Sequence, residues 1–150
     1  RHISSQGQPA YDRRETDRHR RYDRPLSVVF VDPNRFKHLN DTYGHDAGDN
    51  VLRTLGELLR KHVRQSDYVI RWGGDEFLLL LTCGAEEAMV KASELKMAFA
   101  MARDSAGLPS TTGLSVGVAG VPKDADTLSE AIRLADAQMY RDKVAERAEV

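Results

Sequence analysis

The chain has 150 residues, which is long enough for one globular domain with a hydrophobic core. Its 22 basic and 23 acidic side chains nearly cancel, so the composition gives no sign of binding to nucleic acid or to an anionic membrane surface. The single cysteine, Cys83, excludes an internal disulfide and fits a reducing compartment. No apolar stretch is as long as a membrane span and no signal-peptide pattern opens the chain. We therefore expect a soluble, cytoplasmic domain, whose parent protein can still be membrane-anchored.

The N-terminal part of the chain is polar. Residues 1–10 are aperiodic, and we expect a tag remnant or a disordered linker there. Tyr11–Arg24 is dense in charge, with six arginines against four acids. An RNA-binding arm is conceivable, but the interleaved acids favour a solvated helix surface, so we expect no nucleic-acid partner. Residues 11–150 are expected to form the folded domain.

The apolar pattern after residue 25 alternates between strand-like and helix-like segments. The sequence predicts, in chain order, a strand at Leu26–Val31, a helix at Gly48–Arg64, a β-hairpin at Tyr68–Thr82, a helix at Ala85–Arg103, a strand at Thr111–Ala119 and a helix at Thr127–Ala148. This order is that of an α+β, ferredoxin-like βαββαβ core with a mostly antiparallel central sheet. We expect the helices to pack on one face of that sheet.

Residues 71–77 read Arg-Trp-Gly-Gly-Asp-Glu-Phe between two strand-like segments. A Gly-Gly pair can supply the positive φ angles of a two-residue hairpin turn, so we expect a tight turn here. Such a turn holds Asp75 and Glu76 at a rigid tip, where a metal ion or a phosphate-transfer site can use them. In isolation, the same residues would indicate only a turn with solvated acids.

Asp32 ends the first predicted strand. In a ferredoxin-like sheet the hairpin can lie next to that strand, which would bring Asp32 close to Asp75. Two carboxylates on adjacent strands suit Mg²⁺, which prefers hard oxygen ligands and completes its shell with water and substrate phosphates. For an aspartate alone at a strand end, the default alternative is a loop-capping role.

Residues 30–52 read Phe-Val-Asp-Pro-Asn-Arg-Phe-Lys-His-Leu-Asn-Asp-Thr-Tyr-Gly-His-Asp-Ala-Gly-Asp-Asn-Val-Leu. This stretch and the Arg-Trp-Gly-Gly-Asp-Glu-Phe turn resemble the GGDEF domain of diguanylate cyclases, which condense two GTP into cyclic di-GMP. The resemblance implies Mg²⁺ or Mn²⁺ as cofactor, with Asp32, Asp75 and the backbone carbonyl of Pro33 as ligands. It also makes Asp75 and Glu76 the candidates for deprotonating the attacking hydroxyl.

Two segments supply candidates for binding phosphates. Backbone N–H groups near Arg35 and Phe36 begin a helix after the strand, which is a natural phosphate cradle, and Lys37 adds a positive charge. Lys143 and Arg147 lie four apart, hence on one face of the last helix, and match the family's closing Lys-x-x-Gly-Arg-Asn motif. The alternative for these two is that basic residues late in a helix complement its dipole.

Asn40 and Asp49 match the pair that reads guanine in the family. An aspartate can accept hydrogen bonds from N1–H and the exocyclic amine of guanine, and adenine does not present that edge. The alternative for Asp49 is structural, because Asp46-x-x-Asp49 before an apolar stripe resembles an N-terminal capping pattern.

Arg64-Gln-Ser-Asp67 matches the Arg-x-x-Asp of the family's inhibitory product site. Arginine forks suit the phosphates and guanine faces of cyclic di-GMP. The tetrapeptide is common, however, and Arg64 also suits a helix C-terminus.

The chain departs from the family pattern at several positions. Asn34 replaces the second acid of an Asp-x-Asp motif, which removes a negative charge near the metal, while Pro33 keeps the carbonyl that would reach it. Glu146 and Ala148 replace the glycine and asparagine of the closing motif. The motif that normally opens the domain is absent, so we expect an N-terminally truncated domain.

The sequence therefore predicts a diguanylate cyclase domain that acts as a homodimer on GTP, is inhibited by its product and is coupled to an upstream sensory or dimerisation domain. One alternative is a catalytically degenerate domain that acts as a receptor for GTP or cyclic di-GMP. Another is a cyclase that closes a single nucleotide onto itself.

Overall fold

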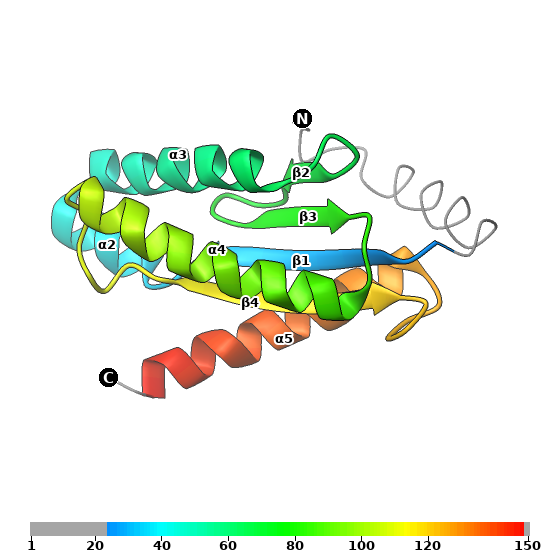
Figure 1. Ribbon diagram of the computed structural model, residues 1–150. Coiled ribbons are helices and arrows are strands. Elements are labelled where there is room, and N and C mark those ends of the chain that lie inside the picture. The colour runs from blue at the N-terminus through cyan, green and yellow to red at the C-terminus, as the bar shows by residue number, and fades with distance from the viewer. Residues whose placement is uncertain (1–23, 149–150) are drawn as a thin grey trace.

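The structure, a computed structural model, describes residues 24–148 (Figure 1). The predicted linker at residues 1–10 and the predicted start of the domain at residue 11 lie outside the described residues. The elements in chain order are β1 (Leu26–Pro33), α2 (Phe36–Tyr43), α3 (His45–His62), β2 (Tyr68–Arg71), β3 (Phe77–Leu81), α4 (Ala85–Ser105), β4 (Leu114–Val121) and α5 (Leu128–Ala148). None of these helices is both long and apolar enough to span a membrane.

The strands described form one antiparallel sheet in the order β2-β3-β1-β4. β1 is central, and every one of its residues is buried. It pairs with β3 over residues 27–31 and with β4 over residues 26–33. The predicted ferredoxin-like α+β class is thus confirmed.

Both faces of the sheet are covered, one by α3 and α4 and the other by α5 (Figure 1). Val29 and Val31 of β1 belong to the core under α3 and α4, whereas Val28 and Phe30 belong to the core under α5. The prediction that the helices pack on one face is therefore wrong. β1 and β3 are nearly continuous apolar runs instead of alternating ones, and such strands need cover on both sides.

α5 lies against β4 at Gly117. A Cβ atom at this position would lie 1.9 Å from the carbonyl oxygen of Ala135 and 2.6 Å from the backbone nitrogen of Met139, so the close approach requires a residue without a side chain. Further along α5, the carboxylate of Asp142 accepts a hydrogen bond from the N–H of Val116 at 2.9 Å. These contacts fix the C-terminal half of α5 along the edge strand.

The connection between β2 and β3, residues 72–76, is longer than predicted. The N–H groups of Trp72 and Gly73 donate to the carbonyl of Glu76 at 2.8 and 3.3 Å. Neither glycine of the pair has a positive φ, so the prediction of a two-residue turn is wrong. The reversal is spread over more residues, and Nε of Arg71 donates to the carbonyl of Gly73 at 3.1 Å, which holds the loop in place.

Candidate functional site

The end of β1 carries Asp32, which is 3% exposed. Nζ of Lys143, from α5, donates to Oδ2 of Asp32 at 2.7 Å, whereas the buried Oδ1 has no hydrogen-bond partner among the described residues. Burial raises the pKa of Asp32 to about 6; the hydrogen bond from Lys143 opposes the rise, and the charges of Asp75 and Glu76 add to it. The carboxylates of Asp32, Asp75 and Glu76 therefore lie within electrostatic reach of one another, and we call them the carboxylate cluster.

The carboxylate cluster fits a divalent cation by its chemistry. Carboxylate oxygens are the hard ligands that Mg²⁺ prefers, and the unpaired buried oxygen of Asp32 is costly until a cation or a donor satisfies it. Within residues 24–148, no three Asp, Glu, His or Cys side chains form a complete metal cluster by themselves. A cation here would need further oxygens, which water, the carbonyl of Pro33 or a substrate phosphate can supply.

Glu76 interacts with a fourth acid, which was not predicted from the sequence. Burial raises the pKa of Glu76, and the carboxylates of Asp136 and Asp75 raise it further, against the positive charge of Lys143. Asp136 lies in α5, seven residues before Lys143, so the two share a helix face. That spacing is the signal by which the sequence pattern could have identified Asp136.

The chain passes from β1 into α2 through Asn34 and Arg35. Arg35 is the N-cap residue of α2, with a left-handed backbone at φ 57° and ψ 35° and no side-chain capping bond. The first turn of α2 contains no acidic residue, so the N–H groups at its start meet no negative charge from that turn. Such a helix start can bind a phosphate, with Lys37 exposed on its first turn and Phe36 packed against the core.

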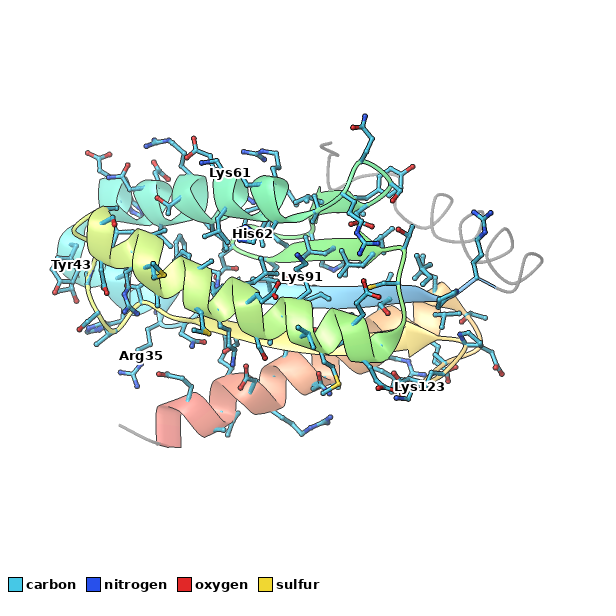
Figure 2. All side chains as sticks on the ribbon, in the orientation of Figure 1. Arg35, Tyr43, Lys61, His62, Lys91 and Lys123 are labelled. Carbon is cyan, nitrogen blue, oxygen red and sulfur yellow. The ribbon has the colours of Figure 1, made fainter. Side chains whose placement is uncertain are left out.

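Two departures from the family motif have partners in the fold. Oε1 of Glu146 accepts a hydrogen bond from Nε of Arg35 at 3.4 Å, and Figure 2 shows Arg35 extending from the start of α2 toward α5. Asn34 is 3% exposed, and its Oδ1 accepts a hydrogen bond from Oγ of Ser115. Asn34 thus ties the end of β1 to β4. The side chain of Arg147 lies outside the described side chains.

Asn40 and Asp49 come from consecutive helices. Oδ1 of Asn40 is buried without a hydrogen-bond partner among the described residues, and a Cβ atom on Gly48 would lie 1.9 Å from it. Asp49 is exposed beside Gly48. The capping alternative is wrong, because α3 begins at His45 after the N-cap residue Gly44 and no side chain caps it. Asp49 is thus exposed on α3, one residue after the Gly48 backbone that lies against the side chain of Asn40.

Arg64 and Asp67 lie in the connection between α3 and β2, and Asp67 contacts Thr82 after the end of β3, whereas Asp75 and Glu76 precede β3. The two residues have different roles. Asp67 is 4% exposed, and its carboxylate accepts hydrogen bonds from the N–H of Arg64 at 2.8 Å and from the N–H and hydroxyl of Thr82 at 2.9 and 3.0 Å. The side chain of Arg64 is exposed and forms an ion pair with Glu87 at 2.8 Å. Asp67 thus joins two segments of the fold, while Arg64 presents its guanidinium to the surface.

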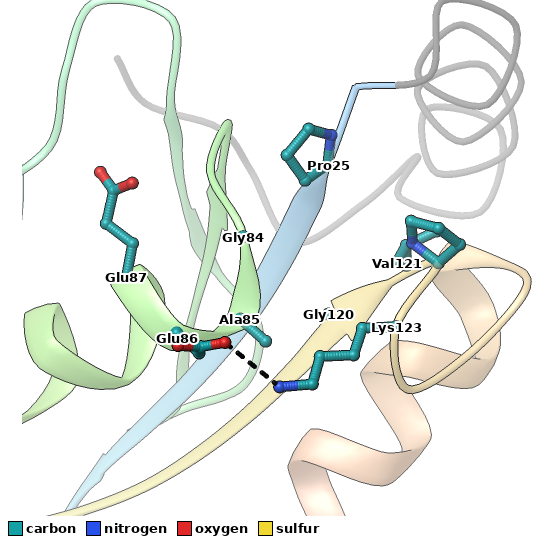
Figure 3. Close-up of a pocket in the computed structure, with 9 residues that line it drawn as sticks. Pro25, Gly84, Ala85, Glu86, Glu87, Gly120, Val121 and Lys123 are labelled. Carbon is teal, nitrogen blue, oxygen red and sulfur yellow. Dashed lines mark ion pairs between the residues drawn. The ribbon is translucent and has the colours of Figure 1, made fainter.

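A cleft of about 330 Å³ lies at the other end of β1 from Asp32 (Figure 3). Pro25, the start of α4 and the end of β4 line it, and Lys123 approaches Glu86 across it at 4.0 Å. None of the predicted site residues lines this cleft. The carboxylate cluster lies at the opposite end of β1.

The chain is similar to known diguanylate cyclases. A family profile described as "Diguanylate cyclase, GGDEF domain" matches residues 11–149. The diguanylate cyclase TpbB of Pseudomonas aeruginosa is 38% identical over 130 residues, which cover 85% of this chain and 29% of TpbB. The diguanylate cyclase DosC of Escherichia coli is 42% identical over 86 residues, which cover 57% of this chain and 19% of DosC. The chain thus spans less than a third of the length of these relatives.

Solved structures agree with this similarity. The GGDEF domain of TpbB has a TM-score of 0.78 and 32% identity, and the match covers 97% of this chain and 91% of that chain. A microbial GGDEF domain described in its interaction with cyclic di-GMP has a TM-score of 0.78 and 31% identity, covering 95% and 88%. The chain belongs to the GGDEF family of diguanylate cyclases, as its motifs predicted.

Proposed function

We propose that this domain condenses two GTP molecules into cyclic di-GMP, with release of two pyrophosphates and with Mg²⁺ or Mn²⁺ as cofactor. The observation that carries the proposal is the carboxylate cluster, in which a buried oxygen of Asp32 has no partner among the described residues, beside Lys143. Oxygen ligands for a cation next to a lysine and an uncapped helix start are what phosphoryl transfer needs.

In the proposed reaction, the 3′-oxygen of one GTP forms a bond to the α-phosphorus of the other, and the bond from that phosphorus to pyrophosphate breaks. A bound cation would neutralise negative charge on the phosphates. Glu76 is suited to accept the hydroxyl proton, because a raised pKa brings a carboxylate closer to neutral pH. Asp75, in the same loop, is the second candidate for this role. Lys143 and Arg147 would hold the triphosphate.

The remaining contacts with GTP come from α2 and α3. We assign the base to Asn40 and Asp49, since the exposed carboxylate of Asp49 can accept from N1–H and the exocyclic amine of guanine, and the amide of Asn40 can donate to O6 or N3. The backbone N–H groups of Arg35 and Phe36 and the side chain of Lys37 would contact the phosphates.

One chain offers one set of these groups, so the proposed reaction takes two copies that face each other with two-fold symmetry. Each GTP then presents its 3′-hydroxyl to the α-phosphate of the other. In a longer, cytoplasmic parent protein, a preceding sensory or dimerisation domain would bring the copies together.

Product feedback is the second part of the proposal. Cyclic di-GMP would bind at Arg64, whose exposed guanidinium can contact a phosphate or a guanine face, on the backbone that Asp67 holds in place. A GGDEF domain 31% identical to this chain is described in an interaction with cyclic di-GMP, which supports binding of the product by this domain.

The alternative, a receptor without catalysis, is favoured by one observation. Glu146 places a carboxylate on Arg35 beside the proposed phosphate site, where the family motif has a glycine. Such a charge disfavours a triphosphate.

The deciding experiment incubates a dimer, forced through a fused leucine zipper, with GTP and Mg²⁺ and determines the product by mass. Cyclic di-GMP from the unmodified domain and none from Asp75→Ala is the expected result. GTP binding without any product would favour the receptor, and cyclic GMP would favour closure of a single nucleotide.

A further inference from the structure

Arg35 and Glu146 join two segments that flank the proposed phosphate site. They are 111 positions apart, and so are Asp32 and Lys143, so two oppositely arranged ion pairs cross the same gap between the β1–α2 connection and α5. In the Asp32–Lys143 pair α5 supplies the cation, whereas in the Arg35–Glu146 pair α5 supplies the anion. The two pairs are not equivalent in strength. Nζ of Lys143 lies 2.7 Å from a nearly buried oxygen, but Nε of Arg35 lies 3.4 Å from a carboxylate that is 35% exposed.

The ion pair between Arg35 and Glu146 is weak enough for a ligand to replace one of its partners. Its one contact uses a single N–H of a guanidinium that has five, so it lacks the two-pronged geometry of a strong arginine–carboxylate pair. Among the residues whose side chains the structure describes, neither side chain has another hydrogen bond or ion pair. A triphosphate offers several charged oxygens to the same guanidinium and can replace the carboxylate.

The backbone fixes where the guanidinium can reach. Arg35 is the N-cap residue of α2 and has a left-handed backbone, so its side chain leaves the chain at the helix start, where the first N–H groups have no intrahelical partner. A phosphate at those N–H groups would lie beside the Arg35 side chain. Glu146 approaches Arg35 from α5. It lies three residues after Lys143, which is one of the residues proposed to hold the triphosphate.

We propose that the Arg35 side chain is a further phosphate-binding cation and that Glu146 is its intramolecular counterion, which the triphosphate displaces. This inference rests on the proposed function, because it places the phosphates of GTP at the start of α2. Glu146 thereby lowers affinity in proportion to the phosphate charge of the nucleotide. It selects for a ligand with enough charge to displace a carboxylate.

The test is equilibrium titration of GMP, GTP and inorganic triphosphate into the unmodified domain and into Glu146→Gln. GTP and inorganic triphosphate should bind Glu146→Gln roughly two- to fivefold more tightly, as expected when a partly exposed ion pair no longer competes. GMP should bind both proteins equally. The matched control is Glu94→Gln, which removes an exposed carboxylate from an i,i+3 pair with Lys91 on α4 and should change nothing.

A second variant separates displacement from positioning. Arg35→Gln should weaken GTP binding, and Glu146→Gln should have no further effect in the double variant, since the two residues act through each other. Weaker GTP binding by Glu146→Gln would instead mean that Glu146 orients Arg35, and unchanged binding would mean that the pair is only structural. Either result overturns the inference.

Failure of the proposed function has a separate signature. If the unmodified domain binds inorganic triphosphate but not GTP, the guanine assignment fails, and tighter triphosphate binding by Glu146→Gln still supports the counterion pair. If neither protein binds triphosphate, the inference is overturned. Thermal unfolding of each variant confirms that the comparison is between folded proteins.

Discussion

Lys143 of α5 and Asp32 of β1 form a hydrogen-bonded ion pair at 2.7 Å across 111 positions of the chain. The pair only partly offsets the burial of Asp32, because one carboxylate oxygen has no partner among the residues described and the pKa of Asp32 remains raised to about 6. The end of β1 therefore carries a cost in stability that a bound cation would relieve. Residues that lower the stability of the fold until a ligand binds are common at functional sites.

The free energy of unfolding should fall as pH rises from about 4 to about 6. The fold raises the pKa of Asp32 from the ordinary aspartate value of 3.8 to about 6, so the folded chain keeps this proton to a higher pH than the unfolded chain does. A raised pKa contributes stability below the unfolded value and loses it as pH rises through the folded value. At about 1.4 kcal/mol for each pH unit, the loss is up to about 3 kcal/mol. Urea unfolding of the unmodified chain and of Asp32→Asn across this range measures it, and an identical pH dependence of the two would contradict the assignment.

Mg²⁺ together with GTP should raise the unfolding temperature of the unmodified domain but not that of Asp75→Ala. A ligand that binds only the folded state stabilises it by about 2.7 kcal/mol at about a hundred times its dissociation constant. Asp75 lies in the loop before β3, where its replacement removes a proposed ligand without opening the core. Asp104→Ala, which alters an exposed acid paired with Arg103 on α4, is the control and should keep the shift. Loss of the shift in both variants would rule out a specific role for Asp75.

Asp49→Ala should reduce the preference for GTP over ATP. Losing a hydrogen bond to a charged group typically costs about 1–3 kcal/mol, and ATP binding does not use that bond. Asp46→Ala is the matched control, since Asp46 is an exposed acid in the first turn of the same helix, and its loss changes the charge at the helix start without removing the carboxylate proposed to read the base. Equal effects of the two substitutions on the GTP-to-ATP ratio of dissociation constants would show that charge alone, and not base reading, is involved.

Gly117→Ala should destabilise the domain by about 1–3 kcal/mol and weaken GTP binding at the same time. The added methyl group would meet the backbone of α5 at Ala135 and Met139, so the helix must move and carry Lys143 with it. Gly113→Ala is the control, because its Cβ would meet only the Nδ2 atom of Asn34 at an ordinary 3.5 Å. Chemical unfolding and GTP titration of both variants give the two quantities. Destabilisation without any loss of affinity for GTP would show that GTP binding does not depend on the position of α5.

Arg64→Ala should lower the affinity for cyclic di-GMP while leaving initial turnover unchanged, whereas Asp67→Ala should mainly destabilise the fold. The carboxylate of Asp67 satisfies the N–H groups of Arg64 and Thr82, and unpaired buried donors cost about 1–3 kcal/mol each. Lys61→Ala, which removes another exposed cation from the last turn of α3, is the control. Unchanged product affinity in Arg64→Ala would leave this tetrapeptide with a structural role alone.

Local patterns in the sequence were enough to predict the strands and the helices α3, α4 and α5 in their order, but for α2 they predicted only a helix start near Arg35 and Phe36. The β-branched run after Leu26 predicts a strand, and the apolar stripe between Val51 and Leu59 predicts a helix. Both patterns depend only on residues close together in the sequence. The acidic residues of the site could also be predicted from the sequence. Asp32 stands at the end of β1, and Asp75 and Glu76 stand just before β3, and the apolar pattern locates both of these strand ends. The membership of the family follows from these motifs.

Only the tertiary structure decided how distant segments meet. The position of α5 depends on the bare backbone at Gly117, and this packing, not any local period, brings Lys143 to Asp32 and Glu146 to Arg35. The sequence pattern could not show that α5 covers the second face of the sheet or that Asp67 turns inward to Thr82. Side-chain partners and burial are set by where two elements cross in space, and residues 111 positions apart carry no local signal of that crossing.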